Sequence, residues 1–487
     1  MITEDVSALK IHNLTQEQYD RELAAGNLDE NALYFTMEGN NGYEQNIEVV
    51  VTTAAGATVY YSDEDGNSYS VNADSNGRAI ISPTKYGTYS FYAVSGDSQS
   101  NTVTLTVDMV KQYKLNLSFY KYYGVKIEIG ISDPEAALTY IDDAEGMSAG
   151  WDNWKDTVIF KDIKPCVLKD GVVQYYLNPD DYTKKEDGTA STLDSTTAGD
   201  VMVEIPKLGY KMTKDSSCHY IWITDDPNAD GYCYAAHSKE SEGDCDKIYI
   251  GAYLGFVSSD EKLYSISDVV PTTDIDISSF CSYTTITRGD GYELFSFYPL
   301  TLLQCLYLLI FKNRDSQTAL GQGYVGGSNG RYTGGTNSSG FMYGSTSTTS
   351  RVKFLGLEDF WGNYSYWVDG IYCDSSCNIL THYKNITEIE SGANYQYSYP
   401  TGASDEGIYN YMSDIIGTNH GGFVIKAASG SDSTYYADYA DLYPDAYACF
   451  GGDWNEESLA GIFYLNISNA GGTGYISARL LYKHLAQ

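Results

Sequence analysis

The sequence predicts a mostly β chain of the α+β class, with a small N-terminal unit, a β-sandwich and one large irregular domain. Three observations lead to this expectation. A short helical pattern and an extended run occupy residues 14–36, several short alternating strands fill 46–108, and glycine, serine, aspartate and tyrosine are frequent from residue 110 onward. The 487 residues are enough for several domains with cores of their own.

The N-terminal unit with its linker spans residues 1–44. Thr15 and Gln18 have the spacing of a capping box, so we expect a short helix that ends at Gly26 and is followed by an extended ALYFT segment. Because this unit is too small to bury a core by itself, we expect it to pack on a neighbouring subunit or a larger assembly.

The second segment, residues 45–109, has apolar residues at alternate positions in six short runs, which are IEVVVTT, ATVYY, SYSV, RAIIS, TYSFYAV and TVTLTVD. Between the second and third runs lies DEDGN, whose Asp65–Gly66 step favours the positive φ angles of a hairpin turn. Short strands at this regular spacing predict an immunoglobulin-like β-sandwich.

Residues 110–487 are expected to form one large irregular domain with long loops. The apolar stretch PLTLLQCLYLLIFKN at 299–313 is too short to span a bilayer, so it predicts a buried helix and no membrane insertion. The Gly- and Ser-rich segment 319–350 predicts a loop.

Composition limits the classes of function. A net charge of −35 repels phosphate backbones, so we expect no nucleic-acid partner. The 48 tyrosines are typical of recognition surfaces, although strand-rich folds also favour tyrosine. The nine cysteines form no regular disulfide framework, so free thiols made in a reducing cytoplasm are expected.

Catalytic and metal-binding motifs are weak. Gly321, Gly323 and Gly326 spell GxGxxG without the strand before and the helix after that a dinucleotide site needs. The segment DPNADG at 226–231 imitates half of a calcium loop, but its twelfth position is His237, so a turn is expected and a weak calcium site stays open. Cys373 and Cys377 lack a second ligand pair for zinc. We therefore expect no catalytic residues, no cofactor and no metal site.

Two segments resemble a known fold. LEDFWGNYSYWVDG, residues 357–370, resembles the GNVWEW signature of the C-type lectin fold as found in formylglycine-generating enzymes, with Gly362, Asn363 and Trp367 at the matching places. The terminal FGGDW and ISARLL segments resemble the closing strands of that fold. The resemblance implies a C-type lectin fold for residues 110–487.

The closing stretch 450–482 is even more similar to the variable proteins of diversity-generating retroelements, which carry GGxW, AGxF and ARL. The matching residues here are Gly451, Gly452, Trp454, Ala460, Gly461, Phe463, Ala478, Arg479 and Leu480. In that family a reverse transcriptase copies a template with errors at adenines, so selected codons vary while scaffold codons stay fixed. The resemblance implies a variable ligand-binding region at about 430–482.

The N-terminal residues 14–36, and the stretch that begins with DDAEGMSAGW, resemble segments common in tail fibre and tail tip proteins of phages that infect gut bacteria. This resemblance implies a virion protein at a phage tail tip or fibre, synthesised in the bacterial cytoplasm. Its expected partners are phage tail proteins, bound through the N-terminal segment, and a bacterial surface receptor, either protein or glycan. A homo-oligomer is expected, with a trimer favoured.

Strand alternation in GIFYLNIS separates core from displayed residues. Phe463, Leu465 and Ile467 are expected in the core, with the residues between them displayed. The tyrosines of 435–447 are expected to border the same surface, although packing beneath the loop is an equal alternative. The predicted ligand-binding residues are Tyr435, Tyr436, Tyr439, Tyr443, Tyr447, Asp453, Asn455, Glu456, Ser458, Ile462, Tyr464, Asn466, Ser468, Thr473 and Tyr475.

Trp454 and Arg479 are expected to have structural roles instead. Trp454 would anchor the displayed surface from the core, and Arg479 would be a buried or half-buried donor to loop carbonyls or a carboxylate.

The leading hypothesis is a non-enzymatic phage receptor-binding adhesin. One alternative is an oxidase of the formylglycine-generating type, which needs a thiol pair near its closing strands, where only Cys449 lies. Another is a calcium-dependent bacterial surface lectin, indicated by the Asp-rich turns.

Overall fold

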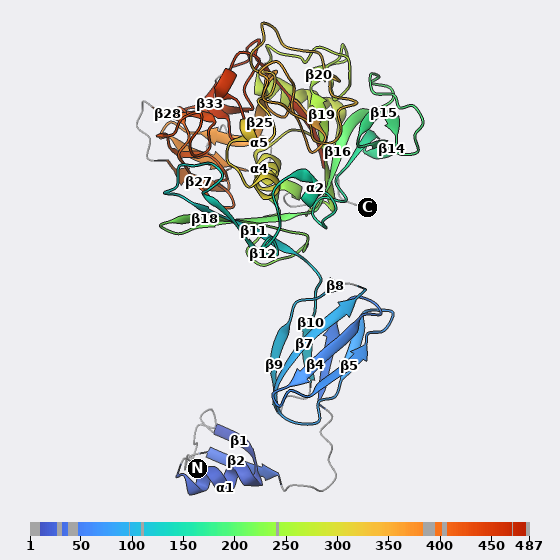
Figure 1. Cartoon of the computed structure of the whole chain (residues 1–487), viewed down its shortest axis with the longest axis vertical. Coiled ribbons are helices and arrows are strands. Elements are labelled where there is room, and N and C mark those ends of the chain that lie inside the picture. Colours follow the sequence, from blue (N-terminus) through green and yellow to red (C-terminus); the bar gives the residue numbers. More distant parts are fainter. Residues whose placement is uncertain are drawn as a thin grey trace, which may run out of the picture. The chain divides into compact units, whose positions relative to one another are not determined.

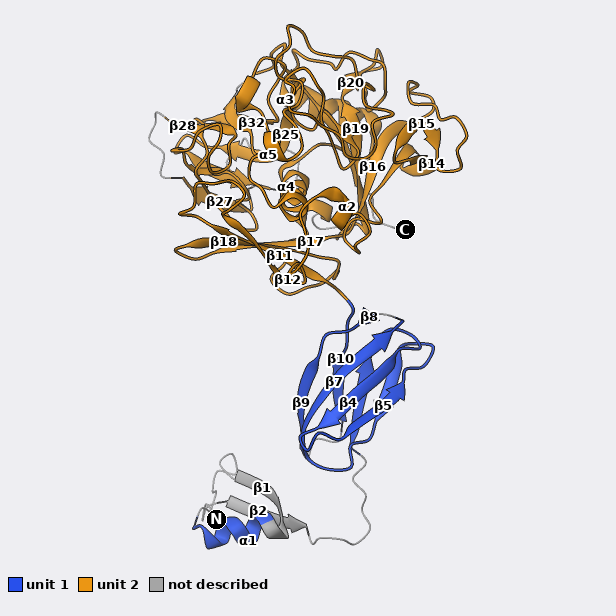
Figure 2. Ribbon diagram, in the orientation of Figure 1, with its two compact units in different colours: residues 1–119 blue, residues 120–487 orange. Residues whose placement is uncertain are grey.

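The computed structural model describes residues 10–26, 32–37, 47–96, 98–108, 112–239, 243–382, 395–401, 407–469 and 471–483. The chain divides into two compact units, residues 1–119 and residues 120–487 (Figure 2). Strands dominate both units (Figure 1), which confirms the expectation of a mostly β chain.

The first unit begins with a strand–helix–strand arrangement. Strand β1 (Lys10–Thr15) pairs in parallel with β2 (Ala32–Met37), and helix α1 (Gln16–Ala24) connects them. The helix and the second strand follow the sequence prediction, whereas β1 was not expected.

A β-sandwich forms the rest of the first unit. Its three-stranded sheet has the order β10-β3-β6, and its five-stranded sheet has the order β5-β4-β7-β8 with β9 also beside β7. Val49 and Ile81 from the first sheet and Phe91 from the second share one buried core. The bounds are β3 (Glu48–Thr52), β4 (Thr58–Asp63), β5 (Ser68–Asn72), β6 (Arg78–Ile81), β7 (Gly87–Ser95), β8 (Ser98–Gln99), β9 (Val103–Val107) and β10 (Gln112–Asn116). The predicted turn between β4 and β5 is present, with Gly66 at a φ of 84°.

The sandwich extends beyond the boundary expected from the sequence. Strand β10 pairs in parallel with β3, and Leu117 behind it is 1% exposed within the sandwich core. The first unit therefore ends at Phe119, not at residue 109. A parallel pairing with a strand about sixty residues earlier leaves no local sequence pattern, which explains the difference.

The second unit contains three large sheets. Their orders are β12-β11-β18-β17, then β15-β14-β13-β16-β19-β35-β22, then β27-β26-β25-β32-β33-β31-β28 with β34 beside β25. The bounds in the four-stranded sheet are β11 (Tyr122–Glu128), β12 (Leu138–Asp142), β17 (Gly209–Lys214) and β18 (Cys218–Thr224). The bounds in the seven-stranded sheet are β13 (Lys164–Lys169), β14 (Val172–Asn178), β15 (Asp181–Lys185), β16 (Asp200–Pro206), β19 (Lys247–Leu254), β22 (Tyr292–Leu294) and β35 (Arg479–Lys483).

The eight-stranded sheet carries four of the predicted site residues, Tyr439, Tyr447, Asn466 and Ser468. Its bounds are β25 (Ser365–Cys373), β26 (Asn378–Thr381), β27 (Tyr397–Pro400), β28 (Ile408–Tyr411), β31 (Tyr439–Leu442), β32 (Ala446–Phe450), β33 (Leu465–Asn469) and β34 (Ile476–Ser477). Three two-stranded ribbons complete the strands, namely β20 (Phe256–Val257) with β21 (Leu263–Tyr264), β23 (Lys353–Phe354) with β24 (Leu357–Glu358), and β29 (Asp414–Ile415) with β30 (Ile425–Ala427).

Helices are few and short, except for one buried helix. Every residue of α4 (Phe297–Phe311) is buried except Phe311, as the apolar sequence predicts. The others are α2 (Trp151–Trp154), η2 (Ala235–His237), α3 (Ile277–Cys281), η4 (Ser282–Ile286), α5 (Ser316–Ala319) and η6 (Glu457–Leu459). None of the helices in the described part of the chain is long and apolar enough to cross a membrane. Residues 320–352, all of them described, form no helix or strand, which confirms the predicted loop.

Candidate functional site

Three neighbouring strands, β33, β31 and β28, form one edge of the eight-stranded sheet, and the first two bring Tyr439, Asn466 and Ser468 together. The register places Asp441 between Tyr409 and Asn466, and Asn466 opposite Cys449. Residues directly opposite one another project from the same face of a sheet. The side chains of Tyr409, Asp441, Asn466 and Cys449 therefore lie on one face of the sheet. Residues two positions further along each strand lie on the same face.

The open part of this face is rich in tyrosine. Tyr409 is 59% exposed and lies parallel to Tyr443, with ring centroids 6.3 Å apart. Tyr411 meets Tyr439 edge-to-face at 6.2 Å. Tyrosine offers a large rigid contact area with a polar tip. We call this surface the tyrosine face and define it as Tyr409, Tyr411, Tyr439, Asp441, Tyr443, Asn466 and Ser468.

The opposite face of the same strands packs into the core. Leu442 and Ile467 are fully buried, and Leu465 is 4% exposed. Asn466 and Ser468 are half-buried and hydrogen-bond to each other. The predicted alternation is therefore confirmed for the strand itself.

The predicted display is wrong for four residues, Tyr436, Asp453, Ile462 and Tyr464, all of which are buried. Strand β33 begins only at Leu465, and the Tyr464 N–H donates to the Gly461 carbonyl in a turn, so alternation does not extend back to 462 and 464. Tyr436 lies edge-to-face against Phe463, with centroids 5.1 Å apart. The Asp453 carboxylate instead caps its own turn by accepting the Asn455 N–H at 2.8 Å.

The remaining predicted residues lie in several places. Asn455, Thr473 and Tyr475 are exposed, and Tyr475 packs on Trp454 at 5.0 Å. Trp454 is half-buried, so it is not the core anchor that the sequence suggests. The Ser458 hydroxyl lies 2.9 Å from the Tyr411 hydroxyl, which joins the 453–459 loop to the tyrosine face.

Two more predicted tyrosines, Tyr447 and Tyr435, pack against residues outside the tyrosine face. Tyr447 packs on Tyr372, with centroids 5.2 Å apart, and Tyr435 lies 5.6 Å from the Arg314 guanidinium. Both are half-buried.

Partial burial changes the acidity of three neighbouring carboxyl groups. Burial, with the nearby charges of Asp453 and Asp441, raises the pKa of Glu456 to about 7. Burial raises the pKa of Asp441 to about 6, although a hydrogen bond with Ser468 opposes the shift. Burial also raises the pKa of Asp453 above its ordinary value. Glu456 and Asp441 therefore change charge near neutral pH.

The backbone of segment 454–463 is held by side chains that lie outside it. Gln304 of α4 donates to the Ile462 carbonyl at 2.8 Å, and Gln317 of α5 donates to the Ser458 carbonyl at 2.9 Å. The Ile462 N–H donates to the Ser316 hydroxyl at 3.1 Å. Because these bonds use only backbone atoms of the segment, they do not depend on its side chains.

Backbone contacts fix the start of the same segment. The Trp454 N–H donates to the Asn363 carbonyl at 3.1 Å, and the Trp454 carbonyl accepts from Gly327 at 2.8 Å. The Glu457 N–H donates to the Val325 carbonyl at 3.1 Å. The segment is thus attached to the 319–350 loop and to the GNYSYW stretch at 362–367, which we call the GNxxxW motif.

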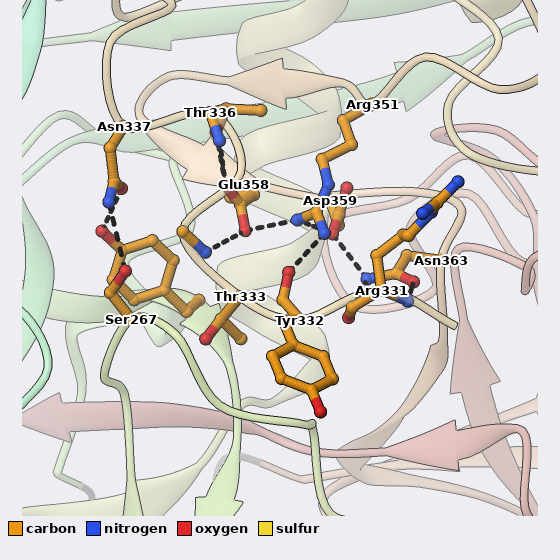
Figure 3. Close-up of polar contacts among 12 residues, drawn as sticks. Ser267, Arg331, Tyr332, Thr333, Thr336, Asn337, Arg351, Glu358, Asp359 and Asn363 are labelled. Atoms are coloured by element: carbon orange, nitrogen blue, oxygen red, sulfur yellow. Dashed lines mark hydrogen bonds and ion pairs between the residues drawn. The ribbon is translucent and has the colours of Figure 1, made fainter. Parts of the chain in front are cut away.

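A buried ionic network in turn orders these supports (Figure 3). Arg351 pairs with Glu358 at 2.7 Å and with Asp359 at 3.0 Å. Glu358 also accepts the Thr336 N–H at 2.6 Å, and Asn363 donates to Asp359 at 2.7 Å (Figure 3). Burial raises the pKa of Asp359, while Arg351 lowers it. The network gives the Gly-rich loop a defined path without regular secondary structure.

Arg479 has the structural role that the sequence suggests. Its guanidinium is fully buried and donates to the Gly251 carbonyl at 2.7 Å, the Glu358 carbonyl at 2.8 Å and the Asp359 carbonyl at 3.1 Å. The last strand, β35, is thereby tied to β19 and to Glu358 and Asp359, which lie just before the GNxxxW motif.

The cysteines are free thiols in the protein interior. All nine are buried, and burial raises the pKa of the Cys449 thiol well above its ordinary value. A thiol of this kind is a poor nucleophile and a poor metal ligand because it resists ionisation. Within the described ranges, no three His, Cys, Asp or Glu side chains gather as metal ligands would.

Sequence reasoning missed Tyr409, Tyr411 and Asp441, as well as the two supporting glutamines. The alternation in IYNYM at 408–412 is a strand signal that could have indicated the two tyrosines. Nothing local indicates that β28 lies beside β31, because that pairing spans about thirty residues of chain.

No protein-family model matches the chain, and no curated protein matches it. One similar solved structure is a candidate polysaccharide binding protein (DUF1812) from Bacteroides thetaiotaomicron, with 9% identity, coverage of 42% of this chain and 75% of that chain, and a TM-score of 0.14. Another is the full-length major pilin SpaD from Corynebacterium diphtheriae, with 10% identity, coverage of 39% and 59%, and a TM-score of 0.14. Likeness at this level carries no argument about the fold or function of this chain.

Proposed function

We propose that the chain is the receptor-binding adhesin of a phage tail, a virion protein without enzymatic activity. It binds a bacterial surface protein or glycan through the tyrosine face and the adjoining 453–459 loop. One observation carries this proposal: Gln304, Gln317 and Asn363 hold the backbone of segment 454–463 from outside, while the Asn455 side chain faces solvent. Such a segment can exchange its outward side chains at little cost in stability.

The chemistry of the tyrosine face supports binding. Aromatic side chains that become desolvated at the centre of an interface contribute most of its affinity. Tyr409 and Tyr443 lie parallel, and Tyr439 is braced by Tyr411, so these rings lose little side-chain freedom when a receptor binds. Polar Asn466 and Ser468 add hydrogen-bonding groups beside them.

The proposed architecture follows the resemblances in the sequence. Residues 120–487 form a C-type lectin fold that acts as the variable protein of a diversity-generating retroelement. The sandwich is an immunoglobulin-like spacer, and the N-terminal segment attaches to phage tail proteins. Three copies assemble into a homotrimer, which multiplies weak contacts into avid adhesion.

Binding to whole cells tests the adhesin role. The fluorescently labelled full chain is incubated with a panel of gut bacteria, and bound fluorescence is counted cell by cell. The intact chain labels at least one strain, and Tyr409→Ala reduces labelling at least ~10-fold because it removes an exposed aromatic contact. Tyr69→Ala, an exposed tyrosine of the sandwich, is the matched control and keeps full labelling. Equal labelling by both variants would contradict the role of the tyrosine face.

The surrounding DNA tests the retroelement role separately. The proposal expects a reverse transcriptase gene nearby and a near-copy of the final codons that differs only where the template has adenine. Substitutions at Asn455, Glu456 and Ser458 among related phage genomes, with Gly451 and Arg479 unchanged, would support it. Variation spread evenly over all these codons would refute it.

A further inference from the structure

The four-stranded sheet carries a second aromatic surface. One face of this sheet packs on the main core through Val125, Ile221 and Ile223. The other face carries Tyr220 and Trp222 of β18, which are both half-buried and lie two residues apart on the same side of the strand.

A close contact with Gly124 and a hydrogen bond to Asp142 hold the indole ring of Trp222 in place. Gly124 of β11 lies directly opposite Trp222, and a Cβ there would come within 2.8 Å of the indole Nε1 atom, so only glycine leaves room for the ring. The ring reaches across β11, where Nε1 donates to the Asp142 carboxylate of β12 at 2.7 Å.

Tyr220 is fixed in a similar way and lies nearly parallel to Trp222. Its hydroxyl donates to the Asp215 carboxylate at 3.0 Å. The two rings differ in plane by 12°, with centroids 5.8 Å apart. Because hydrogen bonds at the edges hold both rings, a ligand can use the ring faces without first ordering the side chains.

The charged groups around the rings are of both signs and take part in hydrogen bonds or ion pairs. Asp215 accepts the N–H groups of Ser217 at 2.7 Å and Cys218 at 2.8 Å, in addition to the Tyr220 hydroxyl. Lys126, which lies opposite Tyr220, pairs with Glu128 at 3.1 Å. The Lys211 ammonium lies 5.4 Å from the centre of the Trp222 ring. The surface therefore offers flat aromatic faces, carboxylate oxygens and one ammonium donor.

We propose that Trp222 and Tyr220 form a glycan-binding platform, separate from the tyrosine face and independent of it. The C–H groups on one side of a pyranose ring carry partial positive charge and pack on the electron-rich ring faces. The sugar hydroxyls accept from Lys211 and donate to the carboxylates of Asp142 and Asp215. A protein partner fits less well, because a stable protein interface buries about 800 Å² on each side and two half-buried rings supply only a small part of that area.

Affinity electrophoresis tests the platform. The full chain is run in native gels that contain a soluble glucan, mannan or xylan. At least one of these polysaccharides retards the intact chain, and Trp222→Ala and Tyr220→Ala each weaken the apparent affinity at least ~10-fold. Tyr332→Ala, which removes an exposed tyrosine on the 319–350 loop, is the matched control and keeps the retardation.

A second measurement separates loss of binding from loss of folding. In the intact chain, the retarding polysaccharide shifts the indole N–H resonance that disappears in Trp222→Phe, and both alanine variants keep the melting temperature of the intact chain within a few degrees. The proposal is overturned if none of the three polysaccharides retards the chain, if Trp222→Ala is retarded as strongly as the intact chain, or if the Trp222 resonance does not shift. Loss of cell labelling in Tyr409→Ala leaves the platform unaffected, so the two sites are tested independently.

Discussion

At the scale of single residues, burial decides what each polar group does. Glu456 is half-buried beside two other carboxylates, which makes its ionisation costly, whereas Arg479 is fully buried and has carbonyl partners for its guanidinium. The first group responds to pH near neutrality, and the second serves as a fixed tie between strands.

Glu456 predicts a dependence of stability on pH. Its folded pKa of about 7 lies above the ordinary value of 4.5, so the folded state holds the proton more tightly than the unfolded state. The contribution of Glu456 to stability is therefore greatest below about pH 4.5 and is lost as the pH rises to about 7. In Glu456→Gln, the fall between about pH 5 and about pH 8 should be smaller by about 1 to 2 kcal/mol after allowance for partial exposure.

Chemical denaturation at several pH values measures this effect. Glu457→Gln, at the exposed neighbouring position, serves as control and should keep the pH dependence of the intact chain. A Glu456→Gln variant with the same pH dependence as the intact chain would show that Glu456 titrates at its ordinary pKa.

We expect the replacement of Arg479 to lower the stability of the protein strongly. Arg479→Met leaves three buried carbonyl groups without their donor, so the free energy of unfolding should fall by about 3 kcal/mol or more. Arg331→Met, at an exposed arginine of the 319–350 loop, should change it by less than about 1 kcal/mol. Thermal unfolding compares the two, and equal effects would argue against the tie between β35 and the carbonyls of Gly251, Glu358 and Asp359.

At the scale of elements, segment 454–463 obtains its order from its neighbours. Helix α4 supplies Gln304, one of its few polar residues, and α5 supplies Gln317. Both side chains bond to carbonyls of the segment, so the helices act as a template for a loop that has little regular structure of its own.

Gln317→Leu is expected to loosen this segment. The variant leaves the Ser458 and Ala460 carbonyls without their side-chain donor, at a cost of about 1 to 3 kcal/mol. Exchange of the backbone amide hydrogens should become faster at residues 454–463, because the segment loses hydrogen bonds that hold its backbone in place. Gln174→Leu, at an exposed glutamine of β14, is the control, and unchanged exchange in Gln317→Leu would contradict the template role.

Because β10 packs in the sandwich, we expect the stable sandwich to end near Phe119 and not at residue 109. A fragment of residues 45–119 should unfold cooperatively, whereas a fragment of residues 45–109 lacks Tyr113, Leu115 and Leu117, which pack on the sandwich core. The loss of this apolar burial should lower stability by about 2 to 4 kcal/mol. Circular dichroism melts of both fragments measure the difference, and equal stability would show that β10 contributes nothing to the sandwich.

At the scale of the whole molecule, short sequence patterns predicted local structure correctly. They did not predict which distant strands pair with each other. The apolar α4, the DEDGN turn and the 319–350 loop could all be predicted from the sequence because short stretches determine them. The pairing of β10 with β3 and of β28 with β31 could not, since each joins strands far apart in the chain.

The candidate site shows the same limit. Alternation correctly separated Ile467 from Asn466 and Ser468 inside β33. It misplaced Ile462 and Tyr464, because the strand begins later than a continuous pattern suggests and the turn before it directs both side chains inward. Where a strand begins depends on its partners, which the sequence does not display locally.

The central claim is that a fixed backbone carries exchangeable side chains, and the stability of a combinatorial library tests it most directly. Asn455 and Thr473, which are both exposed, are substituted together by many residue types, and the melting temperature of each variant is measured. The account predicts that most variants unfold within a few degrees of the intact chain, since each outward substitution changes stability by only about 0.5 kcal/mol. A library in which most variants are unfolded or melt far below the intact chain would contradict it.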